Sequence, residues 1–260
     1  NGSWAYRAGC QATDPIFPLD KCLVKSPDAT NTILLIGDSQ AGSISDGVKA
    51  ASDSLGVNFA VWYNDGCPVF PRPTLEREDC GPFLKALPDL IVRLNPSVIV
   101  VANKSTLYTT GGAQRGGLTI TKPDGHLPKT YSESIDMWIK GLQMEFSSAP
   151  FKGKQILLVQ QVPPSKPVSP TLVNRNRNNY IFDLNSDQDR NQLIKIEFSS
   201  LSSFRNITFL DPADTICPNS SCTIAVNGHP LYSDEFHLSP IGALRLEDQF
   251  KKALRSLTLS

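Results

Sequence analysis

Short, unbroken apolar runs alternate along this chain with segments of helical periodicity, and this alternation limits the fold more than any other feature. The apolar runs lie at residues 33–36, 57–62, 98–102, 156–162 and 207–210. Helical patterns lie between or after them, at residues 40–55, 82–94, 130–147, 186–204 and 240–257. Apolar strands without polar alternation, separated by helices, indicate a parallel sheet that is covered on both faces. The sequence therefore predicts an α/β domain with three layers, α/β/α, around a flavodoxin-like parallel five-stranded sheet.

Helix-end signals support two of these boundaries. Thr130 and Glu133 have the spacing of a capping box, which opens the helix that runs to about residue 147. Ser239 is a suitable N-cap, and Pro240 suits the first helical position after it. The apolar residues that follow recur at helical spacing and predict one continuous last helix: Leu246, Phe250, Leu254 and Leu257.

Length and charge restrict the class of protein. The chain has 260 residues, enough for one substantial core, and we expect a single main domain at residues 32–260. Residues 1–31 are expected to form an irregular leader or linker that packs on this domain. Twenty-five basic residues balance twenty-five acidic ones, so charge gives no argument for a nucleic-acid partner. No apolar run approaches the roughly 18 residues of a membrane span.

Six cysteines in an even, locally spaced set indicate three disulfides, which would place the domain outside the cytoplasm. Pairing of nearest neighbours closes three small loops: Cys10–Cys22, Cys67–Cys80 and Cys217–Cys222. A zinc site is the alternative, but the chain has no Cys-x-x-Cys and its three histidines are scattered. Asp187 and Asp189 look like a metal fragment, yet acids at a helix start explain them better. We expect no metal and no cofactor.

A serine, a histidine and a carboxylate occur where this fold would bring them together. Gly37-Asp38-Ser39 directly follows the first apolar run, so Ser39 is expected at a strand-to-helix turn. Asp234 and His237 stand three residues apart, between the fifth run and the last helix. A serine hydroxyl needs an adjacent base to act as a nucleophile, and a carboxylate can fix the tautomer of that base. The pattern predicts acyl transfer with Ser39 as nucleophile, His237 as general base and Asp234 as the orienting acid.

Two further residues follow strands at the same edge, where ligands bind in open α/β sheets. Gly66 comes after the second run, and Asn103 comes directly after the third. The backbone N–H groups of Ser39 and Gly66 and the side-chain amide of Asn103 are the candidate donors of an oxyanion hole. The alternatives are that Gly66 serves only a turn and that Asn103 simply ends a strand.

Other polar residues receive weaker assignments. Asp38 is expected to stabilise its turn. His126 and His229 lie in loops rich in glycine and proline and are expected at the surface. Arg175 and Arg177 follow the fourth run and could contact substrate, although the asparagine-rich run around them is also typical of a solvated loop.

In order along the chain, these residues resemble the four blocks of the SGNH (GDSL) hydrolase superfamily. The tripeptide ending at Ser39 is similar to the first block, and Asp-x-x-His ending at His237 is similar to the last. Gly66 and Asn103 occupy the places of the second and third blocks. One departure is that the third block normally reads Gly-x-Asn-Asp, whereas Lys104 follows the asparagine here.

A narrower resemblance concerns the sequence around each block. Ile-Gly-Asp-Ser-Gln-Ala, Asn-Asp-Gly-Cys-Pro, Leu-Asp-Pro-Ala-Asp-Thr-Ile-Cys-Pro and Phe-His-Leu-Ser are similar to the SGNH domains of bacterial surface acyltransferases. In that group the SGNH domain follows a polytopic acyltransferase-3 membrane domain. The resemblance implies an extracytoplasmic domain of a membrane protein, at the cell surface or in the periplasm. It also implies O-acyl transfer, most often of acetyl, from a donor delivered by the fused membrane domain to a sugar, polysaccharide or glycolipid.

Two other functions remain open on the same residues. A carbohydrate O-acetylesterase would use the same triad but pass the acyl group to water. A non-catalytic glycan-binding domain on the same fold is a third possibility, against which the complete triad argues.

Overall fold

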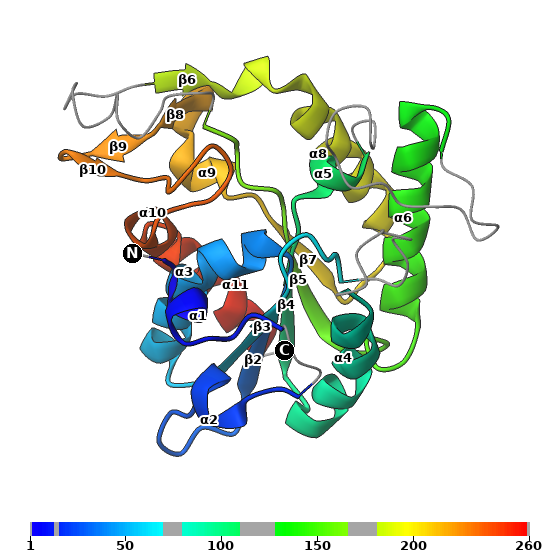
Figure 1. Cartoon of the computed structure of the whole chain (residues 1–260), viewed down its shortest axis with the longest axis vertical. Coiled ribbons are helices and arrows are strands. Elements are labelled where there is room, and N and C mark those ends of the chain that lie inside the picture. The colour runs from blue at the N-terminus through cyan, green and yellow to red at the C-terminus, as the bar shows by residue number, and fades with distance from the viewer. Residues whose placement is uncertain (1, 13–15, 70–79, 110–127, 166–180, 259–260) are drawn as a thin grey trace.

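A six-stranded sheet forms the centre of the protein (Figure 1), and its strand order is β1-β3-β2-β4-β5-β7. The computed structural model describes residues 2–12, 16–69, 80–109, 128–165 and 181–258. The strands, in chain order, are β1 (Leu23–Val24), β2 (Thr32–Gly37), β3 (Asn58–Tyr63), β4 (Val98–Ala102), β5 (Gln155–Val159) and β7 (Ile207–Leu210). All neighbours from β3 to β7 pair in parallel, which confirms the parallel sheet and its flavodoxin-like order.

Helices cover both faces of this sheet and make the predicted three layers. Figure 1 shows α3 (Ser39–Leu55) and α11 (Glu247–Thr258) on one side, and α4 (Cys80–Leu94), α6 (Tyr131–Ser147) and α8 (Gln188–Leu201) on the other. The central strands β2 and β4 are buried at every position, because both of their faces meet helices.

The N-terminal segment is more ordered than expected and adds the sixth strand. It forms α1 (Trp4–Arg7), α2 (Leu19–Cys22) and β1, which pairs antiparallel with β3 at the edge of the sheet. The indole of Trp4 lies 5.5 Å from the ring of Phe59, and the N–H of Ala12 donates to the carbonyl of Tyr63 at 2.7 Å. A two-residue strand carries no periodicity, which is why the sequence suggested an irregular leader and only five strands.

Two element boundaries differ from the expected ones. The fourth predicted strand ends at Val159, three residues early, and Gln160 and Gln161 begin the loop that follows. The last helix is split into α10 (Pro240–Leu244) and α11. At Gly242 the backbone lies against the carbonyl oxygen of Leu231, and a Cβ there would come within 2.0 Å of it. Residues 245 and 246 form a turn between α10 and α11.

Helix caps and smaller elements complete the fold. The hydroxyl of Thr130 accepts from the N–H of Glu133 at 3.2 Å, as the capping box predicts, while the Glu133 carboxylate accepts from Lys129. Several short elements gather beyond the carboxyl ends of the strands (Figure 1). They are α5 (Ser105–Thr109), β6 (Ile181–Asp183), η2 (Leu184–Ser186), α9 (Ala213–Ile216), η3 (Pro218–Ser220), β8 (Ser221–Thr223), β9 (Ala225–Val226) and β10 (His229–Pro230).

Three disulfides join Cys10 to Cys22, Cys67 to Cys80 and Cys217 to Cys222, as nearest-neighbour pairing predicted. In the ranges that the structure describes, no helix is both long and apolar enough to cross a membrane.

Candidate active site

The turn between β2 and α3 places Ser39 at the carboxyl edge of the sheet. Gly37 has a φ of +151°, and a Cβ on it would lie 1.8 Å from the carbonyl oxygen of Ala102 on β4. Only glycine fits between these two strands without displacing one of them. Ser39 follows as the first residue of α3, where a helix leaves its N–H groups without intrahelical acceptors.

Asp38 fixes this turn from inside the protein, which confirms its predicted role. Its fully buried carboxylate caps α3 by accepting from the N–H of Gln40 at 2.8 Å. The other carboxylate oxygen accepts from the N–H of Lys104 at 2.8 Å and from the hydroxyl of Tyr108 at 2.7 Å. Burial raises the pKa of Asp38, and these three donors oppose that rise by favouring the ionised form. The turn that carries Ser39 is thereby tied to the segment that follows β4.

The structure brings Ser39, His237 and Asp234 together, although 198 positions separate the serine from the histidine in the chain. The Nε2 atom of His237 lies 2.8 Å from the Ser39 hydroxyl oxygen. The Nδ1 atom of the same ring lies 2.7 Å and 2.9 Å from the two carboxylate oxygens of Asp234. When Nδ1–H donates to Asp234, Nε2 has its lone pair directed at the serine hydroxyl. This is the geometry of a nucleophile, a base and an orienting carboxylate.

Asp234 is exposed, yet its carboxylate has several donors. One oxygen accepts from the N–H of Phe236 at 2.7 Å and from the N–H of His237 at 2.9 Å. Partial burial raises the pKa of Asp234, but the hydrogen bonds from the His237 ring and the Phe236 N–H outweigh it and lower the pKa to about 2. The carboxylate is therefore ionised across the neutral pH range and can stabilise an imidazolium ion.

We define residues 233–237 as the acid–base loop, because it carries both Asp234 and His237. The N–H of Ser233 donates to the carbonyl of His237 at 2.8 Å and closes the loop on itself. The hydroxyl of Ser165 donates to the carbonyl of Asp234 at 3.2 Å. These bonds fix the backbone of the loop while the carboxylate and the half-buried imidazole stay accessible to a ligand.

The predicted oxyanion donors lie at the same edge. Asn103 follows Ala102, which pairs in register with Gly37, and its side chain is 4% exposed. Within the described residues, neither its amide nitrogen nor its amide oxygen has a hydrogen-bond partner. A buried amide without a partner costs free energy, so a bound group that supplies one would be favoured there. Gly66 lies in the turn after β3 with a φ of +70°. Two residues before it, the N–H of Asn64 donates to the carbonyl of Gly37 at 3.1 Å.

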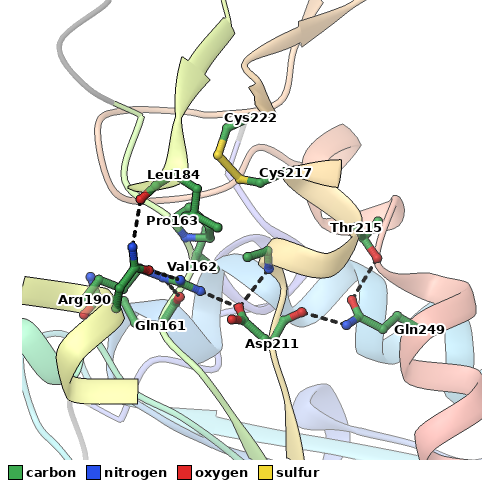
Figure 2. Close-up of polar contacts among 12 residues, drawn as sticks. Gln161, Val162, Pro163, Leu184, Arg190, Asp211, Thr215, Cys217, Cys222 and Gln249 are labelled. Atoms are coloured by element: carbon green, nitrogen blue, oxygen red, sulfur yellow. Dashed lines mark hydrogen bonds and ion pairs between the residues drawn. A yellow bond between two sulfur atoms is a disulfide. The ribbon is translucent and has the colours of Figure 1, made fainter. Parts of the chain in front are cut away.

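The sequence analysis missed a network of buried hydrogen bonds behind the site, which we call the polar brace. Arg190 is almost fully buried, forms an ion pair with Asp211, and donates to the carbonyl of Gln161 at 2.8 Å (Figure 2). The side chain of Gln161 accepts from the N–H and the hydroxyl of Thr106 at 2.9 Å and 2.8 Å. This brace joins α8 to the segments that follow β4, β5 and β7. No motif marked these residues, because their partners lie 21 to 55 positions away in the sequence.

Four other residues were singled out in the sequence. His229 lies on β10 and is exposed, as predicted. His126, Arg175 and Arg177 fall outside the described residues. Among the residues that the structure does describe, no group of histidine, cysteine, aspartate and glutamate side chains could hold a metal ion.

Comparison with solved structures supports the fold. The periplasmic domain of the Salmonella ser. Paratyphi A lipopolysaccharide acetyltransferase matches with a TM-score of 0.67 and 14% identity, over 97% of this chain and 94% of that one. A carbohydrate acetylesterase family member from Sinorhizobium meliloti matches with a TM-score of 0.51 and 13% identity, over 89% of this chain and 100% of that one. A putative arylesterase from Agrobacterium tumefaciens str. C58 has a TM-score of 0.52 at 12% identity, over 88% and 100% of the two chains.

Sequence comparison assigns the family. No curated protein matches the chain significantly. The family model described as "SGNH domain (fused to AT3 domains)" matches residues 9–252, which include all three residues of the serine, histidine and aspartate cluster. Transferases and esterases share this architecture, and an enzyme of the hydrolase or acyltransferase type fits it. The chain belongs to the family of SGNH domains that are fused to AT3 domains.

Proposed function

We propose that this chain is a serine-dependent O-acyltransferase domain that acylates a sugar hydroxyl of the cell envelope through an acyl-Ser39 intermediate. The observation that carries the proposal is the continuous hydrogen-bonded row from Asp234 through His237 to Ser39, with separations of 2.7 Å and 2.8 Å. The family assignment adds that such domains are fused to AT3 domains.

The first half-reaction acylates the serine. His237 Nε2 takes the hydroxyl proton of Ser39 while Oγ attacks the acyl carbonyl, and Asp234 stabilises the imidazolium that forms. The N–H groups of Ser39 and Gly66 and the amide of Asn103 donate to the oxyanion, and one such donor contributes about 3–4 kcal/mol in the transition state. The intermediate then collapses, the bond to the donor's leaving group breaks, and that group takes the proton from His237.

The second half-reaction transfers the acyl group. His237 removes the proton of a sugar hydroxyl, whose oxygen attacks the acyl-serine carbonyl. Collapse of the second tetrahedral intermediate releases the O-acylated sugar, and Ser39 recovers its proton from His237. If water takes the place of the sugar, the same residues make an esterase and release a free acid.

Transfer is our first choice because of the likeness to an acetyltransferase domain over nearly the whole of both chains and the described fusion to AT3 domains. On this proposal the fused membrane domain delivers the acyl group, most often acetyl, to Ser39 on the extracytoplasmic side. Three disulfides support that compartment, because they persist where conditions are oxidising.

Substitution of the nucleophile tests the proposal directly. We expect the protein to hydrolyse p-nitrophenyl acetate and Ser39→Ala to lower kcat/KM by about a thousandfold or more, because the nucleophile is lost. Ser52→Ala is the matched control, because Ser52 lies on the same helix and its hydroxyl donates to the Val48 carbonyl within that helix at 2.9 Å. It should leave the rate unchanged. Full activity in Ser39→Ala would refute the triad, and a folded but inactive wild-type protein would favour the glycan-binding alternative.

Transfer and hydrolysis are separated by their products. The protein is incubated with p-nitrophenyl acetate and cell-envelope oligosaccharides, and the products are identified by mass spectrometry. O-acetylated sugar that depends on Ser39 supports transferase activity. Free acetate as the only product, at every acceptor concentration, would favour the esterase.

A further inference from the structure

Gln40, the residue after the nucleophile, joins three segments of the site. Its side chain is 2% exposed, at the first turn of α3. The amide nitrogen donates to the carbonyl of Phe236 in the acid–base loop at 2.7 Å. The amide oxygen accepts from the N–H of Val162, in the segment after β5, at 3.3 Å. A primary amide, with a donor and an acceptor at one end of a short chain, suits this two-sided role.

Phe236 is also held by its ring. The ammonium of Lys104 lies 3.0 Å from the centre of the Phe236 ring, and the backbone N–H of Lys104 is bound by Asp38. Asp38 and Gln40, the two sequence neighbours of Ser39, therefore each hold a different segment of the site. Asp38 fixes the segment after β4, whereas Gln40 fixes the acid–base loop.

The segment that supplies the Val162 N–H is itself held by hydrogen bonds. Arg190 donates to the neighbouring carbonyl of Gln161 at 2.8 Å (Figure 2). The hydroxyl of Tyr232 donates to the carbonyl of Pro163 at 2.9 Å. Gln40 thus connects the loop that carries His237 to a braced part of the sheet edge. An error of about 1 Å in the placement of a reacting group costs up to about a hundredfold in rate.

We propose that Gln40 is a positioning residue, whose two hydrogen bonds hold the acid–base loop so that His237 Nε2 lies within bonding distance of Ser39. This inference rests on the proposed function, since it concerns the alignment of the same triad. Loss of the two bonds lets the Phe236 carbonyl and the imidazole move away from the serine. The consequence is a lower kcat, while KM for a small acyl ester stays close to that of the wild type.

Gln249 provides a matched control, because it forms the same kind of two-sided bridge elsewhere. Its amide nitrogen donates to the carbonyl of Asp211 at 2.7 Å, and its amide oxygen accepts from the hydroxyl of Thr215 at 2.9 Å (Figure 2). It bonds neither to the acid–base loop nor to Val162. A purely structural role for Gln40 predicts equal effects of Gln40→Met and Gln249→Met, since methionine has a similar shape and removes both bonds.

The first experiment compares kcat, KM and thermal stability of Gln40→Met, Gln249→Met and Ser39→Ala with p-nitrophenyl acetate. We expect Gln40→Met to lower kcat about 10- to 100-fold with KM changed less than about twofold. Gln249→Met should retain kcat within about twofold at a similar loss of stability. Wild-type kcat in Gln40→Met, together with an inactive Ser39→Ala, would overturn this inference alone. An active Ser39→Ala would instead overturn the proposed function.

The second experiment uses Gln40→Glu. A protonated glutamic acid reproduces both bonds, because its O–H donates to the Phe236 carbonyl and its other oxygen accepts from Val162. An ionised one has no donor and repels the carbonyl. The ionisable groups around this position are present in both proteins: Asp38, Lys104, Asp234, Glu235 and His237. The ratio of variant to wild-type kcat should therefore be highest at low pH and fall as pH rises. A ratio that is constant from pH 5 to pH 9 would overturn the proposal.

Discussion

The carboxyl group of Glu197 lies deep between α6 and α8 and should make stability depend on pH. Glu197 is buried, and the indole N–H of Trp138 donates to one carboxyl oxygen at 2.6 Å. Burial raises the pKa of Glu197 to about 7, while hydrogen bonds from Trp138 and Ser105 and the charge of Arg190 oppose the rise. The folded protein therefore holds a proton on this group at pH values where the unfolded chain has released it.

The sign and size of the effect follow from this difference. Between the ordinary pKa of 4.5 and the folded value of about 7, the folded state binds more protons, so the free energy of unfolding falls as pH rises. Each pKa unit corresponds to about 1.4 kcal/mol, which gives about 3 kcal/mol in total. The unfolded chain is already mostly ionised at pH 5, so about 2.5 kcal/mol of the effect falls between pH 5 and pH 8.

Glu197→Gln removes the titration but keeps an oxygen to accept from Trp138. Urea unfolding at pH 5 and at pH 8 gives the free energy of unfolding of the wild type and of the variant at each pH. We expect the variant to lose about 2.5 kcal/mol less than the wild type between these two pH values. Asp136→Asn, an exposed carboxylate on α6, is the control and should leave the dependence unchanged. Equal pH dependence in Glu197→Gln and the wild type would refute the reasoning.

Two more outcomes concern the frame of the site. Gly37→Ala should unfold the protein or abolish esterase activity, because its Cβ would lie 1.8 Å from the Ala102 carbonyl oxygen. Gly81→Ala should be tolerated, because no atom of the described residues lies within 4 Å of a Cβ added there. Circular dichroism and activity of both variants decide, and a normal Gly37→Ala would contradict the packing argument. Replacing Cys67 and Cys80 by alanine should lower the free energy of unfolding by about 3 kcal/mol, because the disulfide closes a loop that restricts the unfolded chain. The measurement is urea unfolding under non-reducing conditions. An unchanged urea midpoint would be inconsistent with that disulfide.

The sheet and the cluster of three residues were predictable because their signals are local. The central strands are buried on both faces, so nearly every residue in them is apolar and the run is visible in the sequence. Ser39 and His237 each sit beside an element boundary that the sequence shows: a glycine turn in one case and a proline-started helix in the other. Parallel pairing then brings such boundaries to one edge.

The features that the sequence did not predict depend mostly on contacts between segments that are distant in the chain. Gln40 looks like any polar residue in the first turn of a helix, and only the fold brings the Phe236 carbonyl 2.7 Å from its amide. The break between α10 and α11 leaves the helical spacing of the apolar residues nearly intact, so periodicity cannot show it, nor can it show the close approach of Gly242 to the Leu231 carbonyl. The edge strand β1 has two residues, too few for any alternating pattern.

The pairing of Ser39 with His237 also links chemistry to the order in which the chain is made. The serine lies on a helix near the start of the domain, and its base lies just before the last two helices, which both pack against that first helix. A growing chain therefore contains Ser39 long before His237 has been added to it. On the proposed function, ester hydrolysis requires the two ends of the domain to have come together, so an unfinished chain would not consume the acyl donor.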